Sequence, residues 1–311
     1  MNSPSSTLKF LASAAALSVA ALVAPAAGQM TQPTSDAAPA SDQASDLPAA
    51  KDVIARYIEA SGGEEAIRAV EKVRTLGTLE MPMFGVSGDM TILVDSSGDT
   101  PVSKATVNIE GMGVIESGVV ASGKGYEVNP MQGTRLLTAE EVASRLEESD
   151  FQSDLDLDKY YSDYQTVGRV TVDGMQTLVV EMTDKEGQTS KVYFAEGGDM
   201  DGLKVMVETV ESTPMGDIPS KNKLSDYREV QGPAGPLKVS FKTEGDAAGN
   251  KVIITLKEVD LQADFTAADM APPAEVEEML KSDEGDQGMG NMDEMEDMDG
   301  VTDDVDDDGM N

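Results

Sequence analysis

The side chains best suited to chemistry in this sequence are carboxylates and thioethers, because histidine, cysteine and tryptophan are absent from all 311 residues. Without His or Cys there is no Ser-His-Asp triad, no cysteine nucleophile and no ordinary zinc site. General acid-base work would fall to carboxylates, Lys or Tyr, whose pKa values need strong tuning to act near neutral pH. We therefore expect a protein that is not an enzyme and that holds no cofactor and no metal.

Three groups of carboxylates suggest a cation site or a catalytic pair. Residues 304–309 match the calcium-loop start D-x-D-x-D-G, but no Glu follows at the twelfth position, so we expect weak calcium binding by a solvated tail. A second group alternates with leucines and comprises Asp154, Asp156 and Asp158. These carboxylates would share one face of an extended segment, or surround the solvated side of a helix. Glu80 and Glu116 would suit a glycosidase-like pair only at a separation that the sequence does not give.

Methionine recurs at every third position near the end of the chain, at Met289, Met292, Met295 and Met298. Thioethers select Cu(I), so this run could bind copper. The spacers are acidic, however, and residues 282–311 contain 13 acidic and no basic residues. Such a composition favours a disordered acidic tail over a metal site.

Methionine also stands next to proline at three places where strand-like segments end, in Met81-Pro82-Met83, Pro130-Met131 and Pro214-Met215. Proline cannot sit in a central strand, so these turns belong at strand ends or on the rim of a sheet. Methionine is flexible and polarizable, which suits a surface that receives apolar ligands. The predicted mouth of a ligand cleft comprises Met81, Met83, Phe84, Met112, Met131 and Met215. The alternative is that these side chains are ordinary core fillers at the ends of the sheet.

The first 26 residues have the pattern of a secretory signal peptide. Residues 10–23 form an apolar run that is too short to span a bilayer, and Ala24 and Ala26 occupy the −3 and −1 positions of a cleavage site. No cysteine follows the run, so we expect no lipid anchor. Residues 27–50 are rich in Ala, Ser and Pro and predict a flexible leader. We expect an exported, soluble periplasmic protein that is not an integral membrane protein.

The formal net charge of −35 limits the partners of the chain. A surface of this sign repels nucleic acid and anionic membrane surfaces, so we expect no nucleic-acid partner. Because no disulfide is available, the fold must depend on a hydrophobic core. Residues 51–281 are long enough for one such domain, and the oligomeric state is left open.

The periodicity of the apolar residues predicts helices first and then a sheet. Residues 52–60 and 64–72 have helical stripes separated by Gly62-Gly63, and Thr138 to Glu141 forms a capping box for a helix over 139–148. Between and after them, apolar residues alternate with polar ones, as in Ala105, Val107 and Ile109 and in Leu203, Val205 and Val207. One buried and one solvated face is typical of an antiparallel sheet. The fold class is α+β, with a β-sandwich or barrel as the alternative.

The order of these segments resembles a known family. "ASGGEEAIRAV" precedes "GTLEMPMFGVSGDMTI", then "GYEVNPMQGTRLL" and a capped helix, "YYSDYQTVGRVTVDG" and "ESTPMGDIPSKNKLSDYREVQG". Over about residues 52–280 the chain is similar to exported outer-membrane lipoprotein-sorting proteins, which are LolA-like. The resemblance implies a curved, mostly antiparallel half-barrel with N-terminal and mid-chain helices. Its concave apolar face would bind lipid or lipoprotein acyl chains.

The other interpretation is a structural or interaction module. Its cleft would be filled by its own side chains, and its acidic tail would bind cations or a partner.

Overall fold

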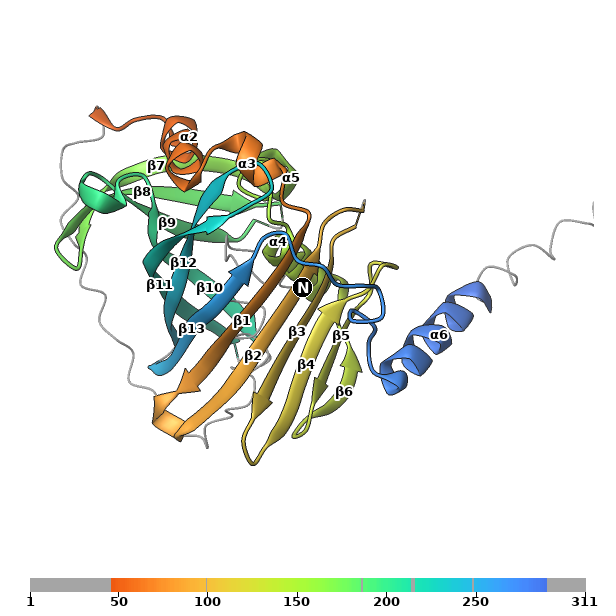
Figure 1. Ribbon diagram of the computed structural model, residues 1–311. Coiled ribbons are helices and arrows are strands. Elements are labelled where there is room, and N and C mark those ends of the chain that lie inside the picture. Colours follow the sequence, from red (N-terminus) through yellow and green to blue (C-terminus); the bar gives the residue numbers. More distant parts are fainter. Residues whose placement is uncertain (1–45, 99, 186, 214–215, 248, 290–311) are drawn as a thin grey trace, which may run out of the picture. The chain divides into compact units, whose positions relative to one another are not determined.

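The computed structural model describes residues 46–289 except 99, 186, 214–215 and 248 (Figure 1). The chain divides into two compact units, residues 1–272 and residues 273–311. The second unit contains helix α6 (Ala274–Met289), which crosses the predicted boundary at Ser282. The signal peptide, most of the leader, the calcium-like loop and the methionines beyond Met289 lie outside the described residues.

The first unit is one antiparallel sheet of thirteen strands in the order β6-β5-β4-β3-β2-β1-β13-β12-β11-β10-β9-β8-β7. The strands of the first half are β1 (Lys72–Met81), β2 (Val86–Asp95), β3 (Val102–Ile109), β4 (Gly113–Val119), β5 (Gly125–Asn129) and β6 (Gly133–Leu136). Those of the second half are β7 (Tyr161–Val172), β8 (Met175–Asp184), β9 (Thr189–Ala195), β10 (Lys204–Thr213), β11 (Gly216–Gln231), β12 (Pro236–Ala247) and β13 (Asn250–Asp260). The sheet therefore consists of two meanders joined by the pairing of β1 with β13.

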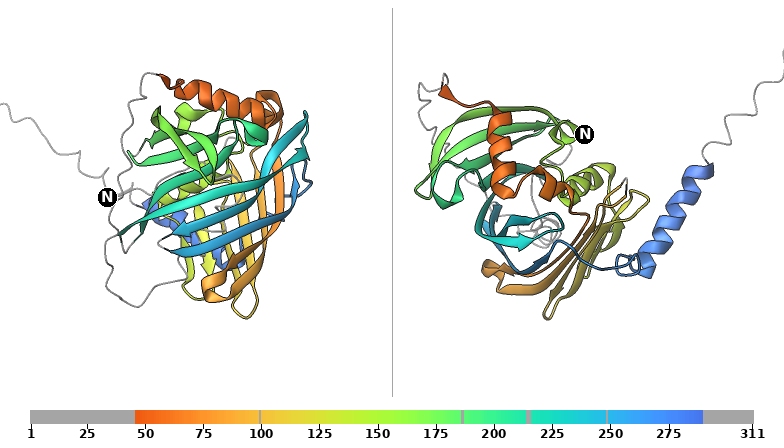
Figure 2. Two further views of the ribbon diagram at one scale, coloured as in Figure 1. Left: turned by 90° about the vertical axis from the view of Figure 1, so that its left-hand side faces the viewer. Right: turned by 45° about the horizontal axis from the view of Figure 1, so that its top comes forward.

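Among the described residues of this unit, four α-helices accompany the sheet: α2 (Ala50–Ser61), α3 (Glu64–Arg68), α4 (Ala139–Ser149) and α5 (Leu157–Tyr160). Helix α2 packs on β7, β8 and β12, α3 packs on β12, and α4 packs on β3, β4 and β5. Figure 2 shows the sheet curling so that its two halves rise on either side of these helices. Since β6 and β7 remain as edges, the sheet is an open half-barrel. The predicted α+β class is confirmed, and the sandwich or closed barrel is wrong.

The concave face carries the core. One apolar cluster joins Ala105, Val107 and Ile109 to residues of α3, β1, β2, β12 and β13. A second joins α2 to alternate residues of β8, namely Leu178, Val180 and Met182. The predicted alternation of Ala105, Val107 and Ile109 is confirmed, whereas β8 is buried on both faces at residues 177–180.

Other apolar residues cover the convex face. Phe265 and Met270, which follow β13, pack against Leu93 and Val102. Lys72 and Lys104 hold this segment by donating to the carbonyl oxygens of Phe265 at 3.0 Å and Ala271 at 2.8 Å. In the described residues, every helix is too short or too polar to cross a membrane.

Candidate functional site: a covered cavity on the concave face

A small cavity of about 50 Å³ lies between α2, residues 150–156 and strands β10–β12. We call residues 150–156, which link α4 to α5, the cover segment. The cavity is mainly apolar, with two lysines, one acid and two tyrosines at its wall. Its lining residues are Tyr57, Ser61, Ile67, Phe151, Asp154, Lys204, Leu224, Tyr227, Leu237, Lys238, Val239 and Ser240.

Two glycines separate α2 from α3, and the first of them lets α2 end close to the sheet. Gly62 has a φ of 128° and ends α2, and Gly63 has a φ of 92°, so both adopt conformations that other residues rarely take. A Cβ on Gly62 would lie 2.6 Å from the carbonyl oxygen of Pro236. The helix break predicted at Gly62-Gly63 is confirmed, and it places Tyr57 and Ile67 above the start of β12.

The centre of the site is a buried ion pair between Lys204 and Asp154. Lys204 Nζ lies 2.7 and 2.6 Å from the two carboxylate oxygens of Asp154, and the side chains are only 3% and 4% exposed. The Tyr57 ring centroid lies 4.2 Å from the same ammonium, a cation–π contact. The Tyr227 hydroxyl donates to the backbone carbonyl of Lys204 at 2.8 Å. The ammonium therefore connects the sheet, α2 and the cover segment.

A β-bulge turns Lys204 toward the cavity. Lys204 pairs with Phe194 of β9, whereas Met206 already pairs with Tyr193, so β10 has one extra residue at Val205. Val205 and Met206 consequently pack with Tyr193 on the convex side, while Val207 packs with Phe194 on the concave side. The prediction that Leu203, Val205 and Val207 share one face is therefore wrong, because Val205 and Val207 pack on opposite faces.

Burial controls the protonation of these groups. Desolvation lowers the pKa of Lys204, and the field of Asp154 opposes that shift. Desolvation and the Asp154 carboxylate raise the pKa values of the Tyr57 and Tyr227 hydroxyls. Both tyrosines thus remain protonated near neutral pH, and neither is a base. The ion pair and the two tyrosines therefore hold the Lys204 ammonium in a mainly apolar cavity.

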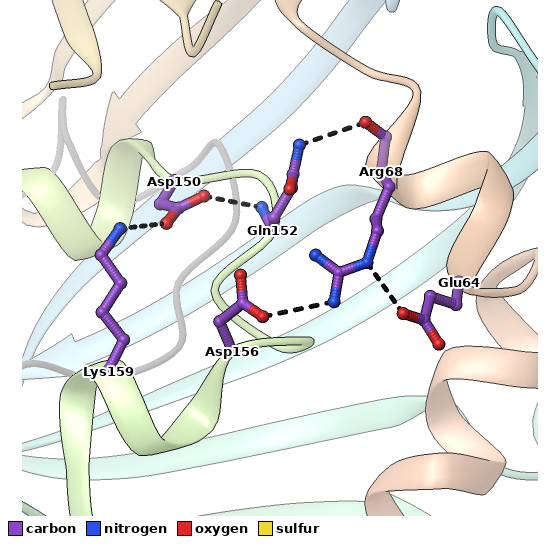
Figure 3. A network of polar contacts seen from close by, with 6 residues as sticks. All are labelled: Glu64, Arg68, Asp150, Gln152, Asp156 and Lys159. Atoms are coloured by element: carbon purple, nitrogen blue, oxygen red, sulfur yellow. Dashed lines mark hydrogen bonds and ion pairs between the residues drawn. The ribbon is translucent and has the colours of Figure 1, made fainter. Parts of the chain in front are cut away.

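Arg68 attaches the outside of the cover segment to α3 (Figure 3). Its guanidinium contacts Glu64 at 2.8 Å and Asp156 at 3.3 Å. Its backbone carbonyl accepts a hydrogen bond from Gln152 Nε2 at 3.2 Å. These side chains are largely exposed, so each ion pair contributes little to stability.

Asp150, the first residue of the cover segment, binds side chains of α5. Its carboxylate accepts from Lys159 at 3.0 Å and from the Tyr160 hydroxyl at 2.5 Å, and it also accepts from the backbone N–H of Gln152 at 2.9 Å. Figure 3 shows Asp150 and Asp156 at the two ends of the segment, each bound to a different cation. The cover segment is thus fixed by polar contacts on its outside and by Asp154 on its inside.

An open groove of about 410 Å³ lies on the other side of the cover segment. It runs between α2 and α5, and Asp154 lines it as well as the cavity. Its remaining lining residues are Lys51, Ile54, Ala55, Ile58, Leu155, Asp156, Leu157, Asp158, Lys159 and Tyr164. The cover segment therefore lies between a small, mainly apolar cavity and a larger, more open groove.

The methionines predicted to form a cleft mouth lie elsewhere. Met81 is buried in the core at the end of β1, Met112 is partly buried in the β3–β4 turn, and Met131 is 66% exposed in the β5–β6 turn. Met83 and Phe84, in the β1–β2 turn, are also exposed. These three turns share the end of the sheet opposite α2 and α3 (Figure 1). None of these five lines the cavity, and Met215 lies outside the described residues.

The predicted carboxylate groups do not gather. Asp154 binds Lys204, Asp156 binds Arg68, and the Tyr164 hydroxyl donates to Asp158 at 3.3 Å. Among the residues described, no three acidic side chains have the arrangement of a metal site.

Glu80 and Glu116 do not form a pair either. Glu116 of β4 lies level with Thr106 of β3, Thr91 of β2 and Leu76 of β1. Glu116 is therefore three strands away from β1, and Glu80 lies a further four residues along β1 from Leu76. That separation excludes the glycosidase arrangement.

Sequence reasoning missed Lys204, Tyr57 and Arg68. One signal was present for Lys204. Residues 203–207, "LKVMV", are all apolar except Lys204, which indicates a strand buried on both faces. A lysine in such a strand must be paired.

Comparison with known proteins gives remote structural likenesses. No family model matches the chain, and no curated protein matches its sequence. A DUF1329 family protein from Desulfovibrio piger is similar over 72% of this chain and 98% of its own, with 11% identity and a TM-score of 0.49. A Vibrio parahaemolyticus domain named for outer membrane lipoprotein sorting covers 70% and 94%, with 10% identity and a TM-score of 0.48. A LolA superfamily protein from Nitrosomonas europaea covers 73% and 99%, with 10% identity and a TM-score of 0.46.

Proposed function

We propose that the protein is an exported, non-catalytic carrier that takes an apolar ligand, a lipid or the acyl chain of a lipoprotein, beneath its cover segment. The observation that supports this most directly is that Asp154 lines both the cavity and the groove. Movement of the cover segment would join a space of about 50 Å³ to one of about 410 Å³. Pockets that hold small ligands have volumes of about 300–1,000 Å³.

The apolar lining supplies the driving force. Ile67, Phe151, Leu224, Leu237 and Val239 would surround an entering chain. Each buried methylene gains about 0.8 kcal/mol, so a dozen gain about 10 kcal/mol, against an association cost of about 4–15 kcal/mol. Long acyl chains are therefore expected to bind, and chains much shorter than a dozen carbons are not.

Export is part of the proposal. Residues 1–26 have the charge and apolar pattern of a signal peptide, and the acidic composition favours a soluble protein. A periplasmic carrier for outer-membrane lipoproteins would be both exported and soluble. The N-terminal residue of the exported protein tests this, and we expect it within a few residues of Ala27.

The second candidate is a structural module with a filled cleft. The cavity volume of about 50 Å³ favours it, because no acyl chain fits without movement. The two candidates differ in whether the cover segment opens. A carrier binds acyl chains saturably, and a filled module does not.

The test is titration of the mature protein with a fluorescent long-chain acyl probe, with displacement by an unlabelled lipid. Mass spectrometry of lipids that copurify from the native envelope would identify the natural ligand. Saturable, displaceable binding is the expected result. Failure of every acyl probe to bind would contradict the carrier and leave the filled module.

A further inference from the structure

The counter-ion of the buried lysine comes from the cover segment and not from the sheet. Asp154 is the single acidic residue among the described residues that line the cavity. The second lysine at the wall, Lys238, is exposed on β12. Glu147 also favours the charged form of Lys204 through its field, but it accepts a hydrogen bond from the Tyr161 hydroxyl at 2.7 Å. Displacing the cover segment would therefore leave Lys204 without its contacting anion.

This arrangement discriminates between ligands. A neutral apolar ligand that displaced Asp154 would surround Lys204 with hydrocarbon, and an unpaired buried charge is strongly unfavourable. A ligand that brings its own anion avoids this penalty, because it exchanges one ion pair for another. We propose that the ligand is an amphiphile with a carboxylate head, whose carboxylate takes the place of Asp154 on Lys204. This inference rests on the proposed carrier function.

The geometry suits a carboxylate. The group that now occupies the position is itself a carboxylate, with both oxygens within 2.7 Å of Nζ. The Tyr57 ring covers another side of the ammonium at 4.2 Å, which restricts the directions from which an anion can approach. Phe151, Leu224 and Leu237 also line the cavity and would contact the first methylenes of the chain. Asp154 thus acts as an internal substitute for the head group while the site is closed.

The experiment compares a fluorescent polyunsaturated fatty acid with its methyl ester on the mature protein at neutral pH. The two probes share one chain and differ only in the head-group charge. We expect the acid to bind at least about tenfold more tightly than the ester. Asp154→Asn removes the competing carboxylate and should strengthen acid binding further, while ester binding changes less.

The variant that isolates the lysine is the double substitution Lys204→Met with Asp154→Asn. It removes both buried charges together, so neither is left unpaired and the protein remains testable. We expect acid and ester to bind it equally. Lys238→Met is the matched control, since it removes the exposed lysine of the same cavity wall and should keep the preference for the acid.

The possible outcomes separate the two proposals. Equal binding of acid and ester to the unmodified protein would overturn the head-group inference while keeping the carrier. A preference that survives in the double variant would remove Lys204 from the recognition of the head group. Absence of binding by both probes would overturn the carrier itself.

Discussion

The ammonium of Lys204 and the carboxylate of Asp154, 50 residues earlier in the chain, meet at 2.6 Å with almost no exposure to solvent. Two charges removed from water regain in their attraction only part of what desolvation costs. Such a pair gives little net stability, but removing either partner leaves the other as an unpaired buried charge. It therefore determines where the cover segment lies more than how stable the protein is.

We predict that Lys204→Ala lowers the free energy of unfolding by about 3–5 kcal/mol, because it leaves Asp154 buried without its cation. Replacing the pair with apolar residues of similar size, Lys204→Met with Asp154→Leu, should be neutral or stabilising. Urea denaturation of the three proteins measures both effects. If the single variant were as stable as the wild type, the pair could not be buried as described.

Arg68→Ala should loosen the cover segment without unfolding the protein. Its pairs with Glu64 and Asp156 are exposed, so we expect a loss of at most about 1 kcal/mol. If the closed segment is destabilised by that amount, an acyl probe should associate up to about fivefold faster, as measured by stopped-flow fluorescence. Lys257→Ala, which breaks an exposed pair with Asp89 on another part of the sheet, should leave the rate unchanged. An unchanged rate for Arg68→Ala would show that the cover segment does not limit entry.

Met131→Glu tests the other end of the sheet. Met131 is 66% exposed and lies opposite the cavity, so we expect neither the melting temperature nor acyl-probe binding to change. Weaker binding at an unchanged melting temperature would place the ligand entrance at the β1–β2, β3–β4 and β5–β6 turns, as the sequence pattern predicts.

Alkaline pH should destabilise the protein through its buried tyrosines. Desolvation and the partner carboxylates Glu116 and Glu208 raise the pKa values of Tyr126 and Tyr193. The folded state therefore keeps these protons while the unfolded chain loses them above about pH 10, so stability is full below pH 10 and falls above it. Each tyrosine contributes a slope of up to about 1.4 kcal/mol per pH unit.

Urea denaturation at pH 9, 10 and 11 measures this slope. The double variant Tyr126→Phe with Tyr193→Phe should reduce the slope, and the buried Tyr57 and Tyr227 hydroxyls should retain the remainder. The lowered pKa of Lys204 acts in the opposite sense, because the folded state releases that proton first and gains stability as pH rises toward about 10.4. This single lysine offsets only part of the effect of the tyrosines. Stability that is constant from pH 9 to 11 would contradict the assigned burial.

The features that were predictable from sequence have local causes. The Thr138 capping box is present in both directions, with Glu141 N donating to Thr138 Oγ1 at 3.2 Å and Thr138 N donating to Glu141 Oε2 at 2.8 Å. The dipeptide Asp173-Gly174, a sequence typical of two-residue hairpins, forms the tight turn between β7 and β8 with positive φ at both residues. Signals of this kind depend on a few neighbouring residues, so one sequence is enough to read them.

The candidate site was not predictable, because its parts are brought together by tertiary structure. The residues around Asp154 in the sequence do not indicate that Lys204 is its partner. The bulge at Val205 also interrupts the alternation from which the direction of the lysine side chain would be predicted. The predicted cleft mouth rests on methionines, whereas the cavity is lined by common apolar residues. Composition indicates which ligand class a protein favours, but it does not indicate which residues line a cavity.

The pairing of β1 with β13 has a consequence for the order of folding. Arg74 and Asp260 are neighbours across this seam although 186 residues separate them, while every other strand pair joins segments adjacent in the chain. The strands within each meander can pair as the chain is synthesised. The pairing of β1 with β13 can form only when nearly the whole chain is available. A chain halted before β13 would expose β1 as an unpaired edge, the kind of surface that recruits other strands. Strand β13 thus completes the middle of the sheet and covers the edge of β1.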